Sequence, residues 1–443
     1  MKTAYTYAQI IKVAYPIFLM MLVQNLIQVI DTAFLGHVGE VELGASAIGG
    51  VYYIAMFTVV FGFSAGAQIL IGRRNGENRQ DKIGEIFLSG TVFLWIIALF
   101  IFFFTHWSSE TILSKMLHSQ HVLKASIEFL NWRIGGLFFA CINVMFRAFF
   151  VGIIRTKVLT FNAICMALTN VFLDYALIFG NWGFPEMGIS GAALASVISE
   201  IVSTGFFIIY LLISVDLKKY GFRGIVLKNF RVIRNILKVS TSLMIQNFLS
   251  LSTWFLFFIA IESMGEATLA VSNIIRSFYM IFGIHIFALS STSSTLVSNT
   301  IGSGKTNEVT ALIWKIARLG LTISLVVSVI LFLFPEPVLR IYTSNPELIK
   351  ESIPSLYVII LVLLTLSVSN VFFQSISGTG NTRSALMIES FTLVIYLLWI
   401  WLMAIYLKAP LAVCWMVEWI YALFLGLLSF FYFRYAKWQD KKI

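Results

Sequence analysis

Two aspartates interrupt long apolar segments of this chain. Asp31 lies late in one such segment, within Val-Ile-Asp-Thr-Ala-Phe-Leu-Gly from Val29 to Gly36, and Asp174 lies late in another. If these segments cross a bilayer, a carboxylate at their depth costs about 2.5 kcal/mol or more, and such residues usually mark the paths of ions or substrates. The two acids are therefore our first candidates for binding a cation.

Other polar side chains fall near these acids. Asn170 is four residues before Asp174, so the two share one helical face, and Ser196 and Glu200 have the same spacing. At a rise of about 1.5 Å per residue, Asp31, Asp174 and Ser196 reach similar depths. Two carboxylates, an amide and a hydroxyl at one level can coordinate Na⁺, with Asp31, Asn170 and Asp174 as its ligands. Alternatively the two carboxylates share a proton, because like charges repel strongly in a low-dielectric site.

Further polar residues inside apolar segments are candidates for the wall of a cavity. Gln24 and Gln28 lie seven and three residues before Asp31, which favours one stripe on the same helix. The cavity candidates are Gln24, Gln28, Glu200, Arg276 and Glu389. For four basic residues, two interpretations stay open: they line a cavity, or they are snorkelling and interhelical groups. These residues are Arg133, Arg147, Arg276 and His285.

The composition places these residues in a membrane protein. Hydrophobic residues make up 59% of the 443 residues and charged residues only 12%, against about 25% charged in soluble domains. Apolar runs of about 20 residues, each long enough to span a bilayer, recur along the whole chain. We expect an all-α integral membrane protein with twelve spans, near residues 9–36, 47–71, 86–107, 125–150, 159–180, 188–214, 236–262, 269–298, 311–334, 353–377, 384–407 and 411–434.

The two halves of the chain repeat each other at one fixed offset in residue number. Gly39-Glu40 returns as Gly265-Glu266, and Gly152 with Thr156-Lys157 returns as Gly378 with Thr382-Arg383. Six spans per half insert with the same orientation, so a pseudo-twofold axis along the membrane normal should relate the halves. A duplication of this kind in a membrane protein indicates transport by alternating access.

The repeat also separates two interpretations of the acids. Asp31 could merely cap a helix near the interface, and Asp174 could be a satisfied polar group between helices. At the offset that takes Gly39 to Gly265, however, Asp31 becomes Phe257, Asn170 becomes Tyr396 and Asp174 becomes Ile400. Duplicated scaffolding should persist in both halves, whereas a specialised ion site need exist in only one, so we favour the ion site.

The net charge of +10 orients the protein and does not indicate a nucleic-acid partner. With the N-terminus inside, we place 23 of the 31 lysines and arginines in inner segments and five in outer ones. This is the positive-inside bias, and it predicts a multi-pass protein of the cytoplasmic (inner) membrane with both termini in the cytoplasm.

Enzyme chemistry is not indicated. The three cysteines all lie within apolar segments without metal-ligand spacing, and the five histidines are scattered. We expect neither catalytic residues nor a cofactor beyond the coupling ion, Na⁺ or H⁺.

Several motifs resemble those of the multidrug and toxic compound extrusion (MATE) family, in its bacterial members. The segment from Gln24 to Gly39 is similar to the family's first-helix signature, and Asn170-Val-Phe-Leu-Asp174 to its fifth-helix pair. The resemblance covers essentially the whole chain. It implies a V-shaped pair of six-helix lobes, which we assign to residues 1–215 and 236–443, with a cytoplasmic linker at 216–235.

The resemblance also implies a function and its residues. The protein would be a cation-coupled antiporter that exports organic, often cationic, drugs or toxic compounds. Asp31, Asn170 and Asp174 would match the family's coupling residues, and Ser196 would stand where many members have threonine. The seventh and tenth spans lack the acids of some branches, so coupling should rest on the N-terminal lobe. We expect a monomer that contacts membrane lipids and small organic substrates. The alternative is a lipid-linked-oligosaccharide or lipid flippase of the same superfamily, which Arg133, Arg147 and Arg276 would suit.

Overall fold

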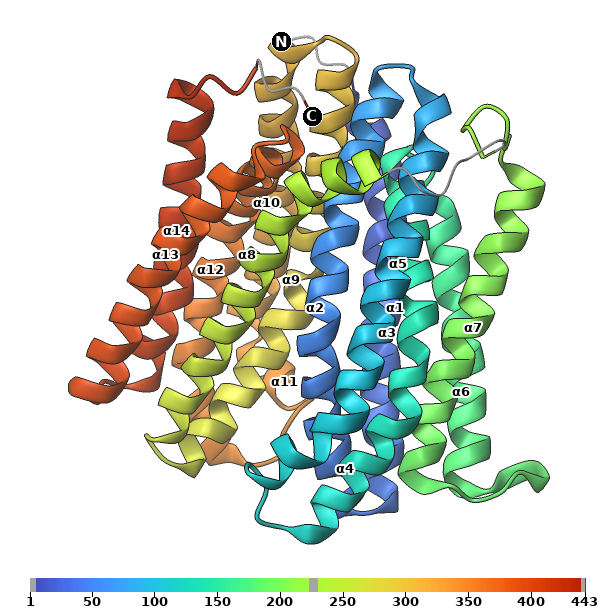
Figure 1. The fold of residues 1–443 in the computed structure, drawn as a ribbon. Coiled ribbons are helices and arrows are strands. Elements are labelled where there is room, and N and C mark those ends of the chain that lie inside the picture. The colour runs from blue at the N-terminus through green and yellow to red at the C-terminus, as the bar shows by residue number, and fades with distance from the viewer. Residues whose placement is uncertain (1–4, 223–229, 440–442) are drawn as a thin grey trace. The chain divides into compact units, whose positions relative to one another are not determined.

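The computed structural model describes residues 5–222, 230–439 and 443, and these residues fold into helices (Figure 1). Twelve helical segments among them are long and apolar enough to cross a membrane, which confirms the predicted number. The α-helices are α1 (Tyr7–Val38), α2 (Glu40–Gly76), α3 (Ile83–Ser114), α4 (Gln120–Arg133), α5 (Leu137–Gly152), α6 (Lys157–Phe179), α7 (Gly188–Ser214), α8 (Phe230–Glu262), α9 (Glu266–Gly302), α10 (Val309–Leu333), α11 (Pro335–Leu339), α12 (Pro346–Gly378), α13 (Thr382–Ile400) and α14 (Leu411–Tyr435).

Two spans have irregularities that the apolar pattern did not predict. The fourth span is divided into α4 and α5 by a 3₁₀ turn at Ile134–Gly136, which contains two consecutive glycines. Glycine lowers the stability of a helix interior by about 1 kcal/mol relative to alanine, so a break at this pair is physically reasonable. The eleventh span continues beyond α13 as a π-helical turn at Trp401–Tyr406.

The internal repeat is visible in the helix bounds. α2 and α9 begin at Glu40 and Glu266 and end at Gly76 and Gly302. The 3₁₀ turns that follow, Gln80–Lys82 and Thr306–Glu308, are related by the same offset. α12 alone covers the length that α4, the 3₁₀ turn and α5 cover together in the first half. The duplication inferred from scattered residue pairs is therefore a duplication of helical elements.

The chain divides into two compact units. One comprises residues 19–244, and the other comprises the described residues up to Phe18 together with those from Ile245 onward. The two boundaries are themselves related by the offset of the repeat. These units differ from the expected lobes, 1–215 and 236–443, because the first parts of α1 and α8 group differently. The expected linker, 216–235, lies partly outside the described residues.

Close backbone packing explains why the start of α8 belongs to the unit of residues 19–244. A Cβ on Gly66 of α2 would lie 2.8 Å from the Cα of Ser240, and one on Gly62 would lie 2.7 Å from the Cα of Met244. Only glycine permits so close an approach between two helices. α2 and the start of α8 are therefore fitted to each other along two turns.

The start of α1 is held within the other unit by a lysine. Lys315 of α10 donates from Nζ to the backbone oxygen of Tyr5 over 2.9 Å, and the same Nζ lies 5.4 Å from the ring centroid of Tyr7. An ammonium over an aromatic ring is attracted by the ring quadrupole. The two contacts account for the grouping of these residues with α10.

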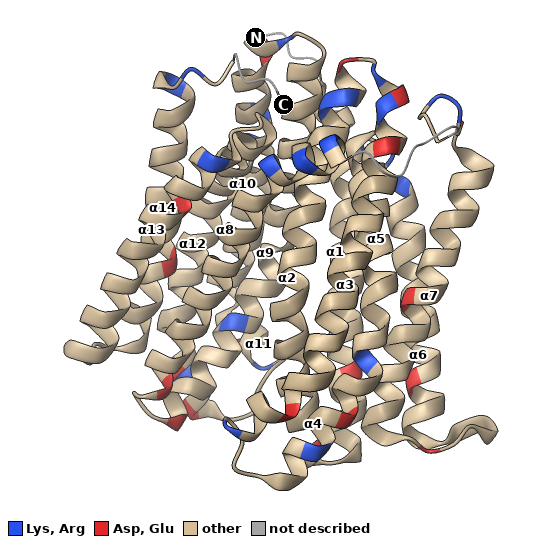
Figure 2. Cartoon of the chain, viewed as in Figure 1, with Lys and Arg blue, Asp and Glu red and all other residues tan. Residues whose placement is uncertain are grey.

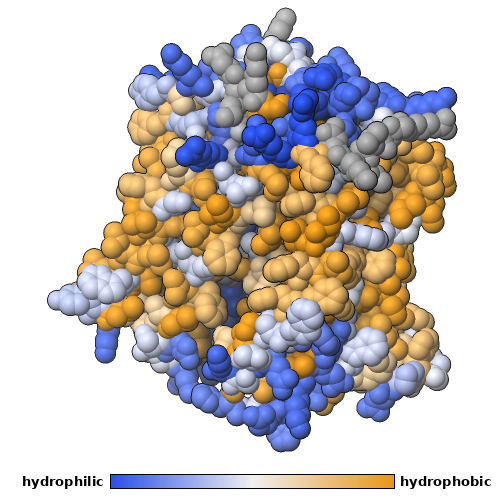
Figure 3. Space-filling view, viewed as in Figure 1, coloured by the Kyte–Doolittle hydropathy of each residue, from blue (hydrophilic) through white to orange (hydrophobic). Residues whose placement is uncertain are grey.

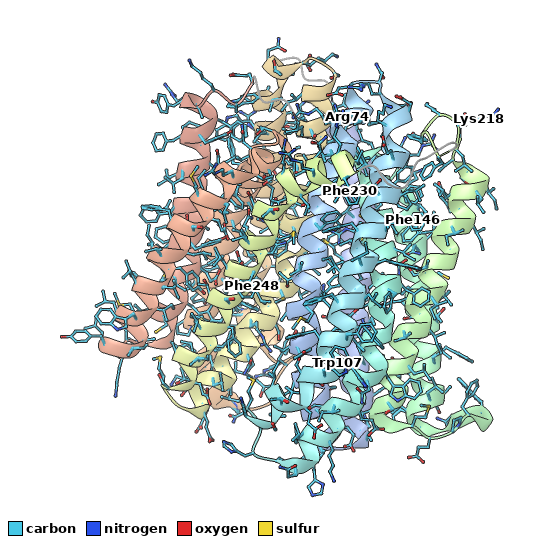
Figure 4. The ribbon with its side chains drawn as sticks, in the orientation of Figure 1. Arg74, Trp107, Phe146, Lys218, Phe230 and Phe248 are labelled. Carbon is cyan, nitrogen blue, oxygen red and sulfur yellow. The ribbon has the colours of Figure 1, made fainter. Side chains whose placement is uncertain are left out.

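Within residues 19–244, consecutive spans run antiparallel and the helices pack side by side, with parallel contacts between alternate spans such as α2 and α5. α6 lies against α7, α5 lies against α2 and α3, and α4 contacts both α2 and α7. Arg74 and Lys218 lie at one end of this unit and Trp107 lies at the other, while Phe146 lies between them (Figure 4). The links α1–α2, α3–α4 and α6–α7 therefore lie at the Trp107 end.

Within the other unit, α12 is the central helix. It packs against α9, α10 and α14, and α13 packs against α14. A buried aromatic group forms the core between α8, α13 and α14, with Phe257, Tyr396 and Trp415 all nearly inaccessible. The rings of Phe257 and Trp415 are 5.0 Å apart and tilted edge to face, a favourable geometry for aromatic pairs.

The surface of each unit has the distribution that a bilayer requires. Within residues 19–244, lysine and arginine gather at the helix ends near Arg74 and Lys218 (Figure 2), the ends that the positive-inside rule predicts to be cytoplasmic. Hydrophobic side chains cover the middle of the helices between more hydrophilic ends on the face shown in Figure 3.

Candidate cation site and its surroundings

The structure brings together Asp31 of α1 with Asn170 and Asp174 of α6. Asn170 and Asp174 are buried, with 1% and 0% exposure, and Asp31 is half-buried. With the amide nitrogen of Asn170 turned toward the acids, Nδ2 lies 3.3 Å from Asp174 Oδ2 and 3.0 Å from Asp31 Oδ1, so it can donate to both. The spacing and depth arguments predicted this grouping of three.

The two carboxyl groups are near enough to hydrogen bond to each other. Ionised carboxylates only accept hydrogen bonds, so such a bond requires a proton on one of them. Asp174 Oδ1 is buried and has no hydrogen-bond partner among the described residues. The arrangement can therefore hold a shared proton, or it can direct carboxylate oxygens at a cation such as Na⁺.

Ser196, the fourth predicted member, does not join this group. It is half-buried on α7, and its backbone oxygen accepts a hydrogen bond from Ser199 Oγ over 2.8 Å. Its side chain makes no hydrogen bond to the acids or to Asn170 within the part of the chain that the structure describes. The depth estimate placed Ser196 at a suitable level, but rotation about the helix axis determines its neighbours.

Glu200 has a partner that the sequence did not reveal. Arg133 at the end of α4 donates to it in a bidentate pair, with Nη2–Oε1 at 2.7 Å and Nη1–Oε2 at 3.2 Å. The side chains are 14% and 7% exposed, respectively. The guanidinium carbon of Arg133 also lies 3.9 Å from the ring centroid of Tyr53. Glu200 is thus one half of a buried ion pair and not a free cavity acid.

A glycine at the helix break after α4 leaves room for this ion pair. A Cβ on Gly136 would lie 2.7 Å from Arg133 Nη1 and would collide with Glu200 Oε2. Asn143 of α5 donates from Nδ2 to the backbone oxygen of Glu200 over 3.0 Å, and Thr204 donates to Asn143 Oδ1 over 3.0 Å. The pair is therefore enclosed by polar groups that leave little freedom.

Arg133 also links the ion pair to the acids. Its positive charge acts on Asp31 as well as on Glu200. Three carboxyl groups and one guanidinium thus share this part of the unit, and a single shared proton between Asp31 and Asp174 would reduce the excess negative charge. Sequence reasoning placed Arg133 among ambiguous residues, because a pairing across α4 and α7 has no signature in the sequence.

The remaining cavity candidates are dispersed. Gln24 and Gln28 are exposed on α1. Two arginines lie over aromatic rings: Arg147 is 5.3 Å from the Phe61 centroid, and Arg276 is 5.2 Å from that of Phe258. His285 Nε2 lies 2.7 Å from Ser324 Oγ.

The described part of the other unit has no copy of the aspartate site, as the offset indicated. Phe257, Tyr396 and Ile400, which take the places of Asp31, Asn170 and Asp174, belong to its buried hydrophobic core. This unit nevertheless contains buried acids elsewhere. Glu389 accepts hydrogen bonds from Ser250 and Tyr421, and Glu418, which sequence reasoning missed, accepts one from Tyr396. The signal that singled out Glu389, an acid within an apolar span, was equally present at Glu418.

Comparison with known families gives a direct match. The MatE family model matches residues 16–176 and again residues 242–402, two segments related by the offset of the repeat. The match covers more than half of the chain and recovers the internal duplication. The chain is also 27% identical over 445 residues to the "Probable multidrug resistance protein NorM" of Thermotoga maritima, covering 98% of this chain and 94% of that protein.

Solved structures share the fold. A MATE transporter of Vibrio cholerae superposes with a TM-score of 0.89 at 16% identity, covering 98% of each chain. An outward-facing multidrug resistance MATE transporter of the MOP superfamily gives a TM-score of 0.88 at 18% identity, covering 98% of this chain and 96% of that one.

The twelve-span repeat and the buried polar site define a multi-pass membrane protein of the transporter class. The chain belongs to the MATE family, whose members are transporters and not enzymes. The family and the fold predicted from the sequence are thereby confirmed.

Proposed function

We propose that this protein is a cation-coupled antiporter that exports organic, often cationic, compounds by alternating access. Membership of the MATE family supports the proposal, as does the multidrug resistance name carried by the Thermotoga maritima relative. Small organic molecules are the substrates we propose, and the coupling ion is Na⁺ or H⁺.

The observation that carries the proposal is the group of Asp31, Asn170 and Asp174. Two carboxyl groups that share one amide donor change their charge and hydrogen bonding when a cation binds or leaves. Such ionisable groups in transmembrane segments mark ion paths in many transporters. We infer that Asp31 is the essential coupling acid, since it is the more accessible of the two.

Coupling follows from different preferences of the two ligands. If the cation and the substrate each stabilise a different conformation, the binding of one shifts the population away from the other. A gradient of the cation then drives export without any covalent chemistry. We further propose lobes of residues 1–215 and 236–443, a linker at 216–235, a cytoplasmic membrane location with both termini inside, and a monomeric state.

The structure does not favour the flippase alternative. That alternative depended on Arg133, Arg147 and Arg276 providing a cationic cavity. Arg133 is neutralised by Glu200, and the guanidinium groups of Arg147 and Arg276 lie over aromatic rings. The flippase remains only as an outcome of the test below.

The proposal is tested by efflux of a cationic dye from proteoliposomes, with a Na⁺ gradient and a pH gradient imposed separately. We expect one gradient to drive efflux by the wild type, and Asp31→Asn to lose that efflux while keeping its thermal stability. Asp81→Asn is the matched control, because Asp81 is an exposed aspartate with a side chain 65% accessible, and we expect it to transport normally.

Two results would contradict the proposal. Normal gradient-driven efflux by Asp31→Asn would remove the coupling role of that residue. If neither gradient drives the efflux of any cationic dye by the wild type, the antiporter proposal fails, and lipid-linked substrates become the next to be tested.

A further inference from the structure

The unit that includes the residues from Ile245 onward contains two buried acids that the proposed mechanism does not use. Glu389 of α13 and Glu418 of α14 are 1% and 4% exposed. Ser250 Oγ and the Tyr421 hydroxyl both donate to Glu389 Oε1, over 2.6 Å and 2.8 Å. The Tyr396 hydroxyl donates to Glu418 Oε1 over 2.8 Å. All the donors in these hydrogen bonds are neutral hydroxyl groups.

Among the described residues, no cation forms an ion pair with either acid. The ion pairs found there include neither Glu389 nor Glu418. From α9, Tyr279 faces Glu418, and from α8, Trp254 does the same. Arg276, a charged residue in the middle of α9, does not pair with either acid, and its guanidinium lies over the Phe258 ring. α12, which packs on α14, has its charged residues only in its first two turns.

Two buried oxygen atoms in this region lack a hydrogen-bond donor among the residues described, which indicates that a hydrogen atom is needed there. Glu389 Oε2 is fully buried and has no hydrogen-bond partner within the described part of the chain. Gln246, one turn before Ser250 on α8 and 4% exposed, likewise has a buried Oε1 without a partner there. Both atoms are acceptors that lack a donor. An acidic hydrogen on a carboxyl group is such a donor, and it also removes a negative charge that is costly to bury in a membrane.

The internal repeat relates the helices around these two acids to α1, α6 and α7, which hold Asp31, Asp174 and Glu200 in the first half. At the offset of the repeat, α8, α13 and α14 correspond to α1, α6 and α7, and Tyr279 of α9 corresponds to Tyr53 of α2. Tyr396 takes the place of Asn170. The ring centroids of Tyr396 and Tyr421 are 6.2 Å apart, so the two tyrosines that bond to these acids pack edge to face against each other. In this unit the buried acids, Glu389 and Glu418, therefore lie at positions different from those of Asp31, Asp174 and Glu200 in the first half.

We propose that Glu389 and Glu418 form a proton-binding site that is separate from the aspartate site, and that the hydroxyl groups of Tyr396 and Tyr421 hold the two acids in place. Each carboxylate takes up one proton to become the neutral acid and returns to the carboxylate when it releases that proton. The role of this exchange in transport rests on the proposed function, whereas proton binding itself does not depend on it.

Infrared difference spectroscopy of the purified protein tests the site directly. Protonated carboxyl groups give carbonyl stretching bands that disappear on ionisation. We expect the wild type to show such bands at mildly acidic pH and to lose them as the pH rises. Glu389→Gln and Glu418→Gln should each remove one band. Glu262→Gln, at the exposed end of α8, should leave both bands unchanged, and so should Asp31→Asn.

Two milder variants keep the test decisive if a glutamine variant fails to fold. Tyr421→Phe and Tyr396→Phe retain the ring and remove only the hydroxyl that bonds to Glu389 or Glu418. Each should shift the band of its own acid and change the pH at which that band is lost. A band that keeps its position and its pH dependence in both variants would overturn the assignment.

Other outcomes would also overturn it. If no carbonyl band in the wild type titrates and depends on these glutamates, the pair does not exchange protons. If Na⁺ added at constant pH removes the bands, the site binds sodium. Failure here is distinguishable from failure of the proposed function. Dye efflux can remain gradient-driven while the bands are absent, and the bands can titrate in a protein that no gradient drives.

Discussion

At the scale of single residues, the acidic side chains inside the unit of residues 19–244 are stabilised in two ways. Glu200 is neutralised by a guanidinium at 2.7 Å, whereas Asp31 and Asp174 share an amide donor and form no ion pair of their own with any described residue. A paired charge is held in one state, while a carboxyl pair without a cation remains responsive to protons or Na⁺. This difference is the reason that we propose the aspartates, and not Glu200, as the exchangeable site.

The ion pair between Arg133 and Glu200 should contribute to the free energy of unfolding. Arg133→Met leaves Glu200 buried without its partner, and we expect it to reduce the free energy of unfolding by about 3–5 kcal/mol. Replacing both partners, Arg133→Met with Glu200→Met, should recover much of that loss because no buried charge remains. Thermal unfolding in detergent measures both effects. A single variant as stable as the wild type would show that the pair does not form.

The sequence predicted the aspartate site and missed the pairings around it. Asn170 and Asp174 are one helical turn apart, and counting residues along each span gave the depth of Asp31, so local rules sufficed. Arg133 and Glu200 are 67 residues apart and meet only through the packing of α4 and α7. Ser196 makes no hydrogen bond to the aspartates for a related reason, because residue number gives the depth of a side chain whereas tertiary packing sets its direction.

At the scale of elements, the break between α4 and α5 is the main departure from a simple span. The apolar pattern predicted one continuous helix over residues 125–150, and the hydropathy of a span does not report where its backbone changes from α to 3₁₀ geometry. In the second half, α12 continues without interruption at the equivalent place. The break is therefore associated with the ion pair of the first half.

A pair of adjacent glycines tests the role of this break. Gly136→Ala would place a Cβ 2.7 Å from Arg133 Nη1, so we expect a loss of about 1–3 kcal/mol in the free energy of unfolding. Gly135→Ala is the matched control, since a Cβ there meets nothing within 4 Å, and it should be neutral or slightly stabilising. Equal unfolding midpoints for the two variants would refute this account of the turn.

At the scale of the whole molecule, the repeat organises both structure and function. One offset relates single residues, helix bounds, the two unit boundaries and the two segments matched by the family model. α1 and α6 hold the aspartate site in one unit, whereas α13 and α14, the equivalents of α6 and α7, hold Glu389 and Glu418 in the other. The two halves thus share one helical frame and carry different buried polar residues within it.

The most direct test of the central claim is the affinity of a fluorescent cationic substrate, measured by titration at a series of Na⁺ concentrations and pH values. Antiport requires that the coupling cation and the substrate weaken each other's binding, and this linkage is reciprocal. We predict that the wild-type Kd rises as one of these cations is increased, and that the Kd of Asp31→Asn does not depend on that cation. An Asp31→Asn variant with the same cation dependence as the wild type would contradict the account.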